Sequence, residues 1–249
     1  MLAVKGLTRY FLDRAGKEFA AVDNVSFEAR PGEVFGLLGP NGAGKTTTLR
    51  MVAAILQPTS GTISLNGKPL DASAADTRRQ LGFLSATTGL YERLTAREIL
   101  TYFARLNRYP KEQLKARVEE VIKAFQIQQF ADTRCEKLST GMRQRVSIAR
   151  SVVHDPFLII LDEPTSGLDV LAKQSIYSFI ENCKEAKKTI VFSTHLMNEA
   201  EKLCDRIGIL HRGHMFEIGT LDELRQKTGL HYLEDIFLSL VREDAVEVF

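Results

Sequence analysis

Short apolar runs alternate with longer amphipathic segments along most of the chain. The runs are rich in aliphatic and β-branched residues and predict β-strands, at residues 34–38, 62–67, 81–84, 157–161, 189–193 and 206–210. They show little of the polar alternation typical of a strand with one exposed face, so they suit a parallel sheet buried on both faces. Because helical patterns separate the runs, the chain is predicted to have an α/β fold.

One long stretch interrupts this alternation, because between about residues 94 and 153, within a predicted subdomain at about 90–155, the hydrophobic spacing is helical throughout. Thr95 and Glu98 have the spacing of a capping box, which marks the start of a helix. Pro110 suits the first turn of a second helix, with Leu114 on its apolar face. We predict a helical subdomain here, inserted into the α/β core.

The segment 137–153, KLSTGMRQRVSIARSVV, also has apolar residues at helical spacing, but it opens on Ser139, Thr140 and Gly141. A glycine within a helix costs about 1 kcal/mol relative to alanine. The Ser139 hydroxyl can cap the N-terminus of this helix. The small and polar residues at the start of this predicted helix are also candidates for binding a ligand.

The overall composition is that of an ordinary globular protein. The chain has 249 residues, and its net charge of +2 gives no strong basic field for nucleic acid. The three cysteines are widely spaced and predict reduced thiols rather than a disulfide framework or a metal site. The longest strongly apolar run, FLIIL, is far shorter than the roughly 20 residues that span a bilayer, and the N-terminus lacks a signal-peptide pattern. If the chain works at a membrane, we expect another polypeptide to cross it.

Residues 39–46, GPNGAGKT, match the phosphate-binding pattern G-x-x-x-x-G-K-[ST]. Glycines let such a loop fold back so that its N–H groups converge on phosphate oxygens, and the following helix adds the positive end of its dipole. Lys45 can reach the terminal phosphates, and the Thr46 hydroxyl suits Mg²⁺. The alternative is a glycine-rich turn with a chance lysine. The predicted strand before the loop and the helix after it favour phosphate binding.

Polar residues also follow two later strands. Asp162 and Glu163 end the strand at 157–161, where one carboxylate can hold the water shell of Mg²⁺ and the other can polarise an attacking water. His195 follows the strand at 189–193, on the side of an α/β sheet where ligands bind. A solvated strand end and a structural histidine are the alternatives, and the complete phosphate loop argues against them.

The order and spacing of these motifs resemble those of the ATP-binding-cassette (ABC) ATPases. The resemblance extends from LTRYF to about residue 220, and its motifs are Gly39–Thr46, Leu138–Met142, Leu161–Pro164, Ser166–Asp169 and His195. The segments GLYERLTAREIL and YLEDIFLSLVRED are similar to the ABC-2-type exporter subfamily and, within it, to the NatA-like ATPases of sodium-extrusion systems. The resemblance implies a P-loop NTPase core with a mainly parallel sheet, an N-terminal antiparallel β portion and an inserted helical subdomain. It implies an ATP-binding domain at residues 1–225 and a short C-terminal tail at 226–249.

The resemblance also assigns roles to residues. The expected ATP contacts are Phe11, Gly39, Pro40, Asn41, Gly42, Ala43, Gly44, Lys45, Thr46, Thr47, Ser139, Thr140, Gly141, Met142 and Asp169. The expected Mg²⁺ ligands are Thr46 and Asp162, and the expected catalytic residues are Lys45, Glu163 and His195. Tyr10 is the alternative to Phe11 as the platform for adenine. In this family the signature binds ATP held by another subunit, so Ser139 can cap its own helix and also meet the γ-phosphate across a dimer interface.

Three positions depart from the family pattern. Thr140 replaces the usual signature glycine and Met142 the usual glutamine, which keeps backbone N–H donors but removes a side-chain contact. Where the family has a glutamine close to magnesium, this sequence has Ala86, which offers no oxygen to a hard cation. A water, or the Thr87 hydroxyl, can take that place.

The resemblance implies the ATP-binding and ATP-hydrolysing subunit of an ABC-2-type exporter. Two copies would enclose two ATP·Mg²⁺ and energise a separate polytopic membrane permease. The subunit would lie at the cytoplasmic face of the cell membrane, and Na⁺ is the leading candidate for the exported species. A complete set of motifs in one chain favours a homodimer. The alternatives are export of a drug, lipid or polysaccharide, and a soluble ABC ATPase of a non-transport assembly. A P-loop kinase or GTPase is disfavoured by the signature and His195, and by the lack of an N-K-x-D motif.

Overall fold

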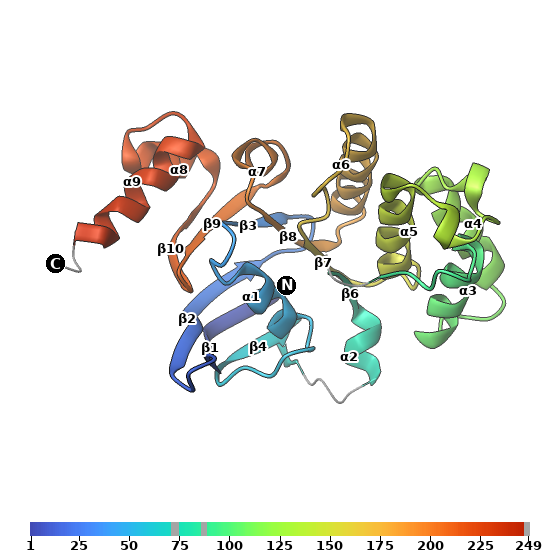
Figure 1. Cartoon of the computed structure of the whole chain (residues 1–249), viewed down its shortest axis with the longest axis horizontal. Coiled ribbons are helices and arrows are strands. Elements are labelled where there is room, and N and C mark those ends of the chain that lie inside the picture. Colours follow the sequence, from blue (N-terminus) through green and yellow to red (C-terminus); the bar gives the residue numbers. More distant parts are fainter. Residues whose placement is uncertain (71–74, 86–88, 247–249) are drawn as a thin grey trace.

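The computed structural model describes residues 1–70, 75–85 and 89–246, which form two sheets surrounded by helices (Figure 1). The first sheet is antiparallel, with the strand order β2-β1-β4-β5. Its strands are β1 (Leu2–Leu12), β2 (Glu18–Ala29), β4 (Ser60–Leu65) and β5 (Lys68–Pro69). The second sheet has the order β10-β9-β3-β8-β7-β6. Its strands are β3 (Val34–Leu38), β6 (Leu81–Leu84), β7 (Leu158–Asp162), β8 (Thr189–Thr194), β9 (Arg206–His211) and β10 (His214–Gly219).

The second sheet is mainly parallel, as the apolar runs predict. Strands β9, β3, β8, β7 and β6 run in one direction, and β10 pairs antiparallel with β9 at the edge. Every residue of β3, β7 and β8 is buried, as expected for strands that are covered on both faces. The predicted α/β fold with an N-terminal antiparallel portion is confirmed.

One predicted strand lies in the other sheet. The run at 62–67 corresponds to β4, which pairs antiparallel with β1. Ile63 and Leu65 are buried while Thr62 is exposed, so only one face of β4 meets the core. The prediction that this run joins the parallel sheet was therefore wrong.

Helices cover both faces of the second sheet. Helix α1 (Lys45–Val52) follows β3 and lies between the two sheets (Figure 1). The other helices are α2 (Ala75–Gln80), α3 (Ala96–Leu106), α4 (Leu114–Ala124), α5 (Thr140–Val152), α6 (Val170–Glu185), α7 (Met197–Leu203), α8 (Leu221–Thr228) and α9 (Leu233–Val246). Short 3₁₀ helices at Gln128–Phe130 and Cys135–Lys137 precede α5. Helices α3, α4 and α5 gather at one end of the molecule, beyond β6 (Figure 1).

The predicted capping box at the start of α3 is present. The Thr95 hydroxyl accepts a hydrogen bond from the Glu98 backbone N–H at 3.2 Å, and the Glu98 carboxylate accepts one from Thr95 N–H at 2.8 Å. Two N–H groups that a helix start leaves unpaired are thereby satisfied.

Helix α4 begins at Leu114 rather than at Pro110, which corrects the prediction. Gln113 N–H donates to Pro110 C=O at 3.1 Å, which closes a tight turn before the helix. The α-helical bonding starts with Arg117 N–H to Gln113 C=O at 2.9 Å. Pro110 therefore opens the turn that leads into α4.

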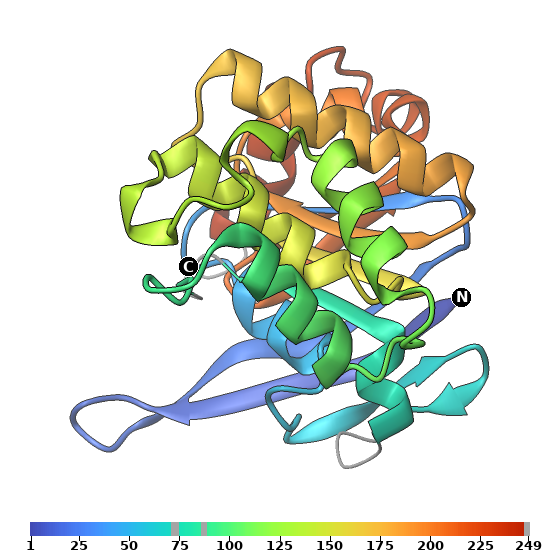
Figure 2. The ribbon, with the colours of Figure 1, turned by 90° about the vertical axis from the view of Figure 1, so that its right-hand side faces the viewer.

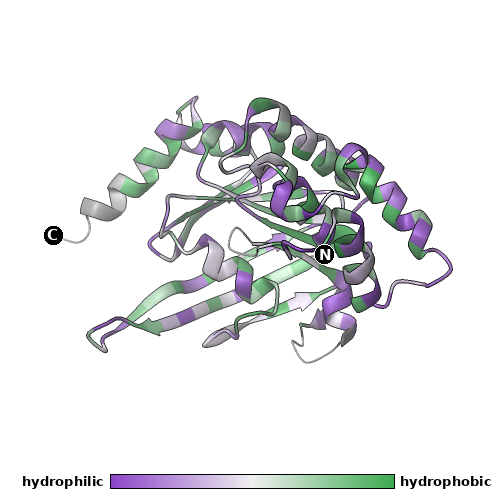
Figure 3. Cartoon of the chain, turned by 45° about the vertical axis from the view of Figure 1, so that its right-hand side comes forward, coloured by the Kyte–Doolittle hydropathy of each residue, from purple (hydrophilic) through white to green (hydrophobic). Residues whose placement is uncertain are grey.

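Buried apolar side chains form three clusters. One lies between the second sheet and helices α3 to α6, one lies between the two sheets around α1, and one joins α7, α8 and α9 to β9. Hydrophobic residues concentrate on the strands, whereas the helices alternate hydrophobic and hydrophilic positions (Figure 3). The predicted boundary at residue 225 lies inside α8, and Leu233 and Ile236 of α9 are buried in the third cluster. None of the described helices has the length and apolar character needed to cross a membrane.

Candidate active site

The phosphate loop connects the end of β3 to α1, so a buried strand and a helix start position it as predicted. Gly44 has φ of 103°, a backbone region that other residues rarely adopt. At Gly39 an added Cβ would lie 2.1 Å from the carbonyl oxygen of Leu210, so only glycine fits there. No side chain caps the N-terminus of α1. The N–H groups of its first turn are therefore suited to bind an anion.

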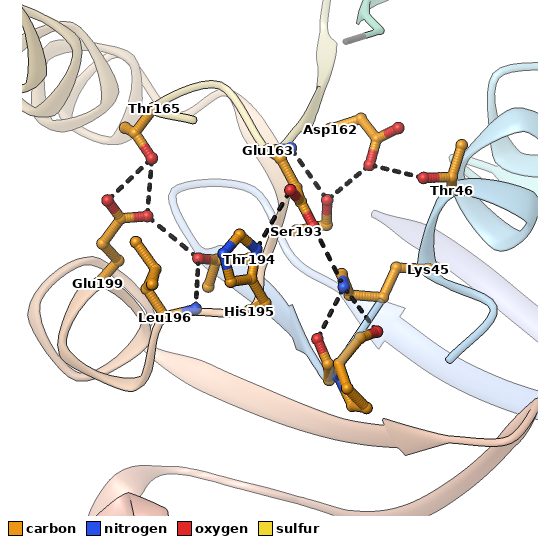
Figure 4. A network of polar contacts seen from close by, with 12 residues as sticks. Lys45, Thr46, Asp162, Glu163, Thr165, Ser193, Thr194, His195, Leu196 and Glu199 are labelled. Atoms are coloured by element: carbon orange, nitrogen blue, oxygen red, sulfur yellow. Dashed lines mark hydrogen bonds and ion pairs between the residues drawn. The ribbon is translucent and has the colours of Figure 1, made fainter. Parts of the chain in front are cut away.

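Lys45 lies across this loop and is buried. Its ammonium group donates to the carbonyl oxygens of Gly39 at 2.7 Å and Pro40 at 3.1 Å, and lies 3.2 Å from Glu163 Oε1 (Figure 4). The charge is thus held where the loop and the end of β7 meet. A phosphate bound by the loop can replace the carbonyl groups and Glu163 as its partner.

Asp162 is buried at the carboxyl end of β7. Its Oδ1 accepts hydrogen bonds from Thr46 Oγ1 at 3.2 Å and from Ser193 Oγ at 2.8 Å. The structure therefore brings together the two predicted Mg²⁺ ligands. Their hydroxyl and carboxylate oxygens are the hard donors that Mg²⁺ prefers, so this pair fits the ion. Ser193 was not predicted, although it is a polar residue at the end of an apolar strand.

Glu163 and His195 lie beside each other at the ends of β7 and β8. His195 Nδ1 is 3.2 Å from Glu163 Oε2, at an angle outside hydrogen-bonding geometry (Figure 4). Glu163 has φ of 47°, a conformation that costs roughly 1 kcal/mol for a non-glycine residue. Its N–H donates to Ser193 C=O at 3.2 Å and Ser193 Oγ at 3.1 Å, which holds this conformation.

The signature residues lie on a different surface. Ser139 caps α5, because its hydroxyl accepts a hydrogen bond from Met142 N–H at 3.3 Å. The signature residues share a concave surface with the segment between β7 and α6, and its lining includes Ser139, Thr140, Gly141, Met142, Gly167 and Asp169. Among the described residues that line this surface, none belongs to the phosphate loop.

Residues 22–166 match the protein-family model for the ABC transporter family, which is more than half of the chain. The chain belongs to the ABC transporter family. It is 41% identical over 244 residues to the ABC transporter ATP-binding protein NatA of Bacillus subtilis (strain 168), and the alignment covers 97% of this chain and 99% of NatA. The Nod factor export ATP-binding protein I of Cupriavidus metallidurans is 39% identical over 207 residues, with 83% of this chain and 68% of that protein covered.

A solved structure has the same fold. The ATP-binding cassette MJ0796, in a dimeric post-hydrolysis state bound to ADP and Pi, has a TM-score of 0.80 and 28% identity, and covers 88% of this chain and 98% of that one. The recognition of the family, the fold class and the ATPase activity are thereby confirmed. This ABC protein is the ATP-binding subunit of a transporter and hydrolyses ATP.

Two further predicted ATP contacts of this ABC subunit, Phe11 and Asp169, also lie outside the phosphate loop. The Arg9 guanidinium lies 4.9 Å over the ring of Phe11, and its Nη1 donates to the carbonyl oxygen of Gln57, just beyond α1. Phe11 therefore lies on the face of β1 that Arg9 connects to the segment after α1, and the strand alternation puts Tyr10 on the other face. The β1–β2 hairpin extends away from the rest of the chain (Figure 2). Asp169 caps α6 by accepting a hydrogen bond from Ala172 N–H at 2.8 Å.

Sequence reasoning also missed a buried acid in this ABC subunit. Glu199, in α7, is four positions after His195, and its carboxylate accepts hydrogen bonds from four side chains. Figure 4 shows those from Thr165 and Thr194. One of the donors is Tyr177, and burial, together with the Glu199 carboxylate, raises the pKa of Tyr177 to about 12. An acidic residue on the buried face of an amphipathic segment is the signal that marks Glu199. Ala86 and Thr87, at the expected place of the family's glutamine, lie outside the described residues.

Proposed function

We propose that two copies of this chain close around two ATP·Mg²⁺ and that hydrolysis drives a separate polytopic permease of an exporter, at the cytoplasmic face of the membrane. The convergence of Lys45, Thr46, Asp162, Glu163 and His195 on one end of the parallel sheet carries this proposal. The family supplies ATP hydrolysis and transport. The residue roles, the symmetric dimer and the exported species are proposals.

The proposed roles follow from the charge, the N–H groups or the oxygen atoms that each residue offers. Lys45 and the N–H groups of α1 would neutralise the phosphates. Thr46 and Asp162 would hold Mg²⁺, which supplies charge stabilisation for phosphoryl transfer when it is bound. Glu163 would take the proton of the attacking water, and His195, beside it, would contact the γ-phosphate.

The concave surface around the α5 N-terminus supports a composite site. Its Ser139 hydroxyl and backbone N–H groups suit a phosphate, but the phosphate loop of the same chain does not line it. We therefore propose that this surface meets the γ-phosphate held by a second copy. Phe11, on the face of β1 that Arg9 connects to the segment after α1, is proposed to stack on adenine.

We expect Gly141→Asp to keep ATP binding but to lose hydrolysis. A Cβ at Gly141 would lie 3.6 Å from Ala172 Cβ, an ordinary contact, so the variant should fold. Its charge would face the second copy's phosphate, and like charges about 4 Å apart at an effective dielectric near 20 repel by about 4 kcal/mol. ATP binding and steady-state phosphate release on the purified variant check this.

Mixing variants tests whether the signature acts across the interface. In a heterodimer of Gly141→Asp and Lys45→Ala, both defects occupy one composite site, so the other site should restore turnover above the sum of the two separate variants. A mixture of Lys45→Ala and Glu163→Gln is the matched control, because it leaves one defect in each site. Heterodimers of the first pair without any turnover would contradict a signature that acts in trans.

We propose that an exposed aromatic patch, formed by Tyr91 and by Tyr102 of α3, contacts the permease. Tyr91 is 54% exposed and lies edge-on to Tyr102, with ring centroids 6.3 Å apart. We expect Tyr91→Ala to reduce permease-stimulated turnover more than basal turnover. Tyr232→Ala is the control, because Tyr232 is also exposed (65%) and directly precedes α9, which lies at the opposite end of the molecule from α3 (Figure 1). An equal loss of both rates in Tyr91→Ala would assign Tyr91 to packing alone.

Sodium is the proposed exported species, because the chain is similar over its whole length to NatA and resembles sodium-extrusion ATPases. The test reconstitutes the chain with the membrane protein that copurifies with it and measures ATP-dependent Na⁺ flux from vesicles. Because a Nod factor export protein is also similar, export of a lipid-like or oligosaccharide substrate is the second candidate. Copurification of only soluble proteins would favour a non-transport assembly instead.

A further inference from the structure

A buried carboxylate lies outside the phosphate site and has no role in the proposed chemistry. The side chain of Glu199 is 2% exposed. Its oxygens accept hydrogen bonds from Thr165 Oγ1 (2.7 and 2.8 Å), Lys173 Nζ (3.0 Å), Tyr177 OH (3.2 Å) and Thr194 Oγ1 (3.1 Å). Burial acts to raise the pKa of Glu199, but the hydrogen bonds from Thr165 and Lys173 outweigh it, and the net shift of the pKa is downward. Glu199 is therefore a buried, ionised carboxylate whose two oxygens both accept hydrogen bonds.

Two of the four donors to Glu199 come from the segments that carry the proposed catalytic residues. Thr165 follows Glu163 by two positions, and Thr194 directly precedes His195. Glu199 thus connects the segment after β7 to the segment after β8 (Figure 4). Strands β7 and β8 are paired up to Asp162 and Ser193, and the carboxylate that bonds both segments holds them together just beyond that pairing.

The turn that carries His195 is held through the same contact. The Thr194 hydroxyl donates to Glu199 and accepts a hydrogen bond from Leu196 N–H at 3.0 Å. No side chain caps α7, which begins directly after this turn. Loss of the carboxylate would therefore free both the Thr194 hydroxyl and the start of α7 to move, and His195 with them.

We propose that Glu199 is a positioning residue for ATP hydrolysis, which holds His195 in place relative to Glu163. The proposal rests on the catalytic roles proposed for those two residues. Glu199 does not reach the phosphate site itself, because it lies on the opposite side of His195 from Lys45 (Figure 4). It acts through His195, and a shift of about 1 Å in a catalytic group is enough to lower a rate by about a hundredfold.

We test this with Glu199→Gln in the full-length protein, because the amide keeps the shape but replaces one of the two acceptor oxygens with an NH2 donor and removes the charge. Either Lys173 and Tyr177, which bond Oε1, or Thr194, which bonds Oε2, then loses its acceptor. We expect kcat for ATP hydrolysis to fall by about tenfold or more, because His195 moves. The dissociation constant for ATP should change less than twofold, because the phosphate loop is intact. If this variant does not fold, Thr165→Val supplies the same comparison, since it removes one hydroxyl and keeps the volume.

A double variant separates positioning from a general loss of stability. In the His195→Ala background, Glu199→Gln should lower kcat little further, because the residue through which it acts is gone. The matched control is Glu33→Gln. Glu33 is also a buried acid and pairs with Arg206 at 3.2 Å, but it lies before β3, at the opposite end of the sheet. It should lower the thermal midpoint and leave kcat unchanged.

The outcomes are distinct. Wild-type kcat in Glu199→Gln, or an equal fold loss with and without His195, overturns the positioning role. If Glu163→Gln or His195→Ala keeps wild-type turnover, the proposed catalytic roles fail instead. A loss of kcat in Glu33→Gln equal to that in Glu199→Gln would assign both residues to stability alone.

Discussion

Replacing Glu163 by glutamine is expected to lower kcat for ATP hydrolysis by roughly 10²–10⁴-fold while ATP still binds. Glutamine keeps the shape of glutamate but accepts a proton poorly, so it cannot take the proton of the attacking water. Its carbonyl oxygen can still accept a hydrogen bond from Lys45, which the carboxylate contacts at 3.2 Å. Steady-state phosphate release and ATP binding on the purified variant measure the two effects separately.

The same variant should accumulate an ATP-bound dimer, because closure no longer leads to hydrolysis. Size-exclusion chromatography in saturating ATP·Mg²⁺ detects it as a shift to twice the monomer mass. Glu33→Gln serves as the control for removing a buried acid elsewhere. Full-rate hydrolysis by Glu163→Gln would remove Glu163 from its proposed role, and a persistent monomer would count against the ATP sandwich.

Lys45→Ala is expected to reduce ATP binding and turnover by at least about a hundredfold, because a charge-assisted contact to the terminal phosphates is lost. In this structure Lys45 also donates to Gly39 and Pro40 C=O, so its loss leaves the loop less well held as well. Equilibrium binding of ATP and steady-state turnover both report the effect.

Lys227→Ala is a matched control for the removal of a lysine. Lys227 forms an ion pair with Glu217 between α8 and β10, away from the phosphate loop. We expect wild-type ATP binding from this variant. Wild-type turnover by Lys45→Ala would contradict the assignment of the phosphate loop.

Local patterns were enough to locate the phosphate loop, the acidic pair at the end of β7 and the capping box of α3. In each case the physical cause acts within a few residues: glycines permit the loop, apolar runs form buried strands, and Thr95 bonds Glu98 across one turn. For the same reason Ser139 was predicted to cap α5, and it does. The start of α4 was misplaced because Pro110 suits a tight turn as well as a helix.

The contacts between distant segments could not be predicted in this way. The sequence does not show which strand lies beside which. The order β3-β8-β7 places β8 next to β7, so Ser193 reaches Asp162 and His195 lies beside Glu163. The same order brings Thr46, at the start of α1, to Asp162. The run at 62–67 joined the antiparallel sheet because only one of its faces could be buried.

The sequence by itself therefore determined the class of fold, the loop between β3 and α1 and the family, because these depend on local spacing and residue type. Only the tertiary structure decided how Glu199 connects the segments after β7 and β8, because its partners lie 5 to 34 positions away in the chain. A buried carboxylate is stable only when its hydrogen bonds are satisfied, and packing of α6 and α7 against the sheet brings those donors together.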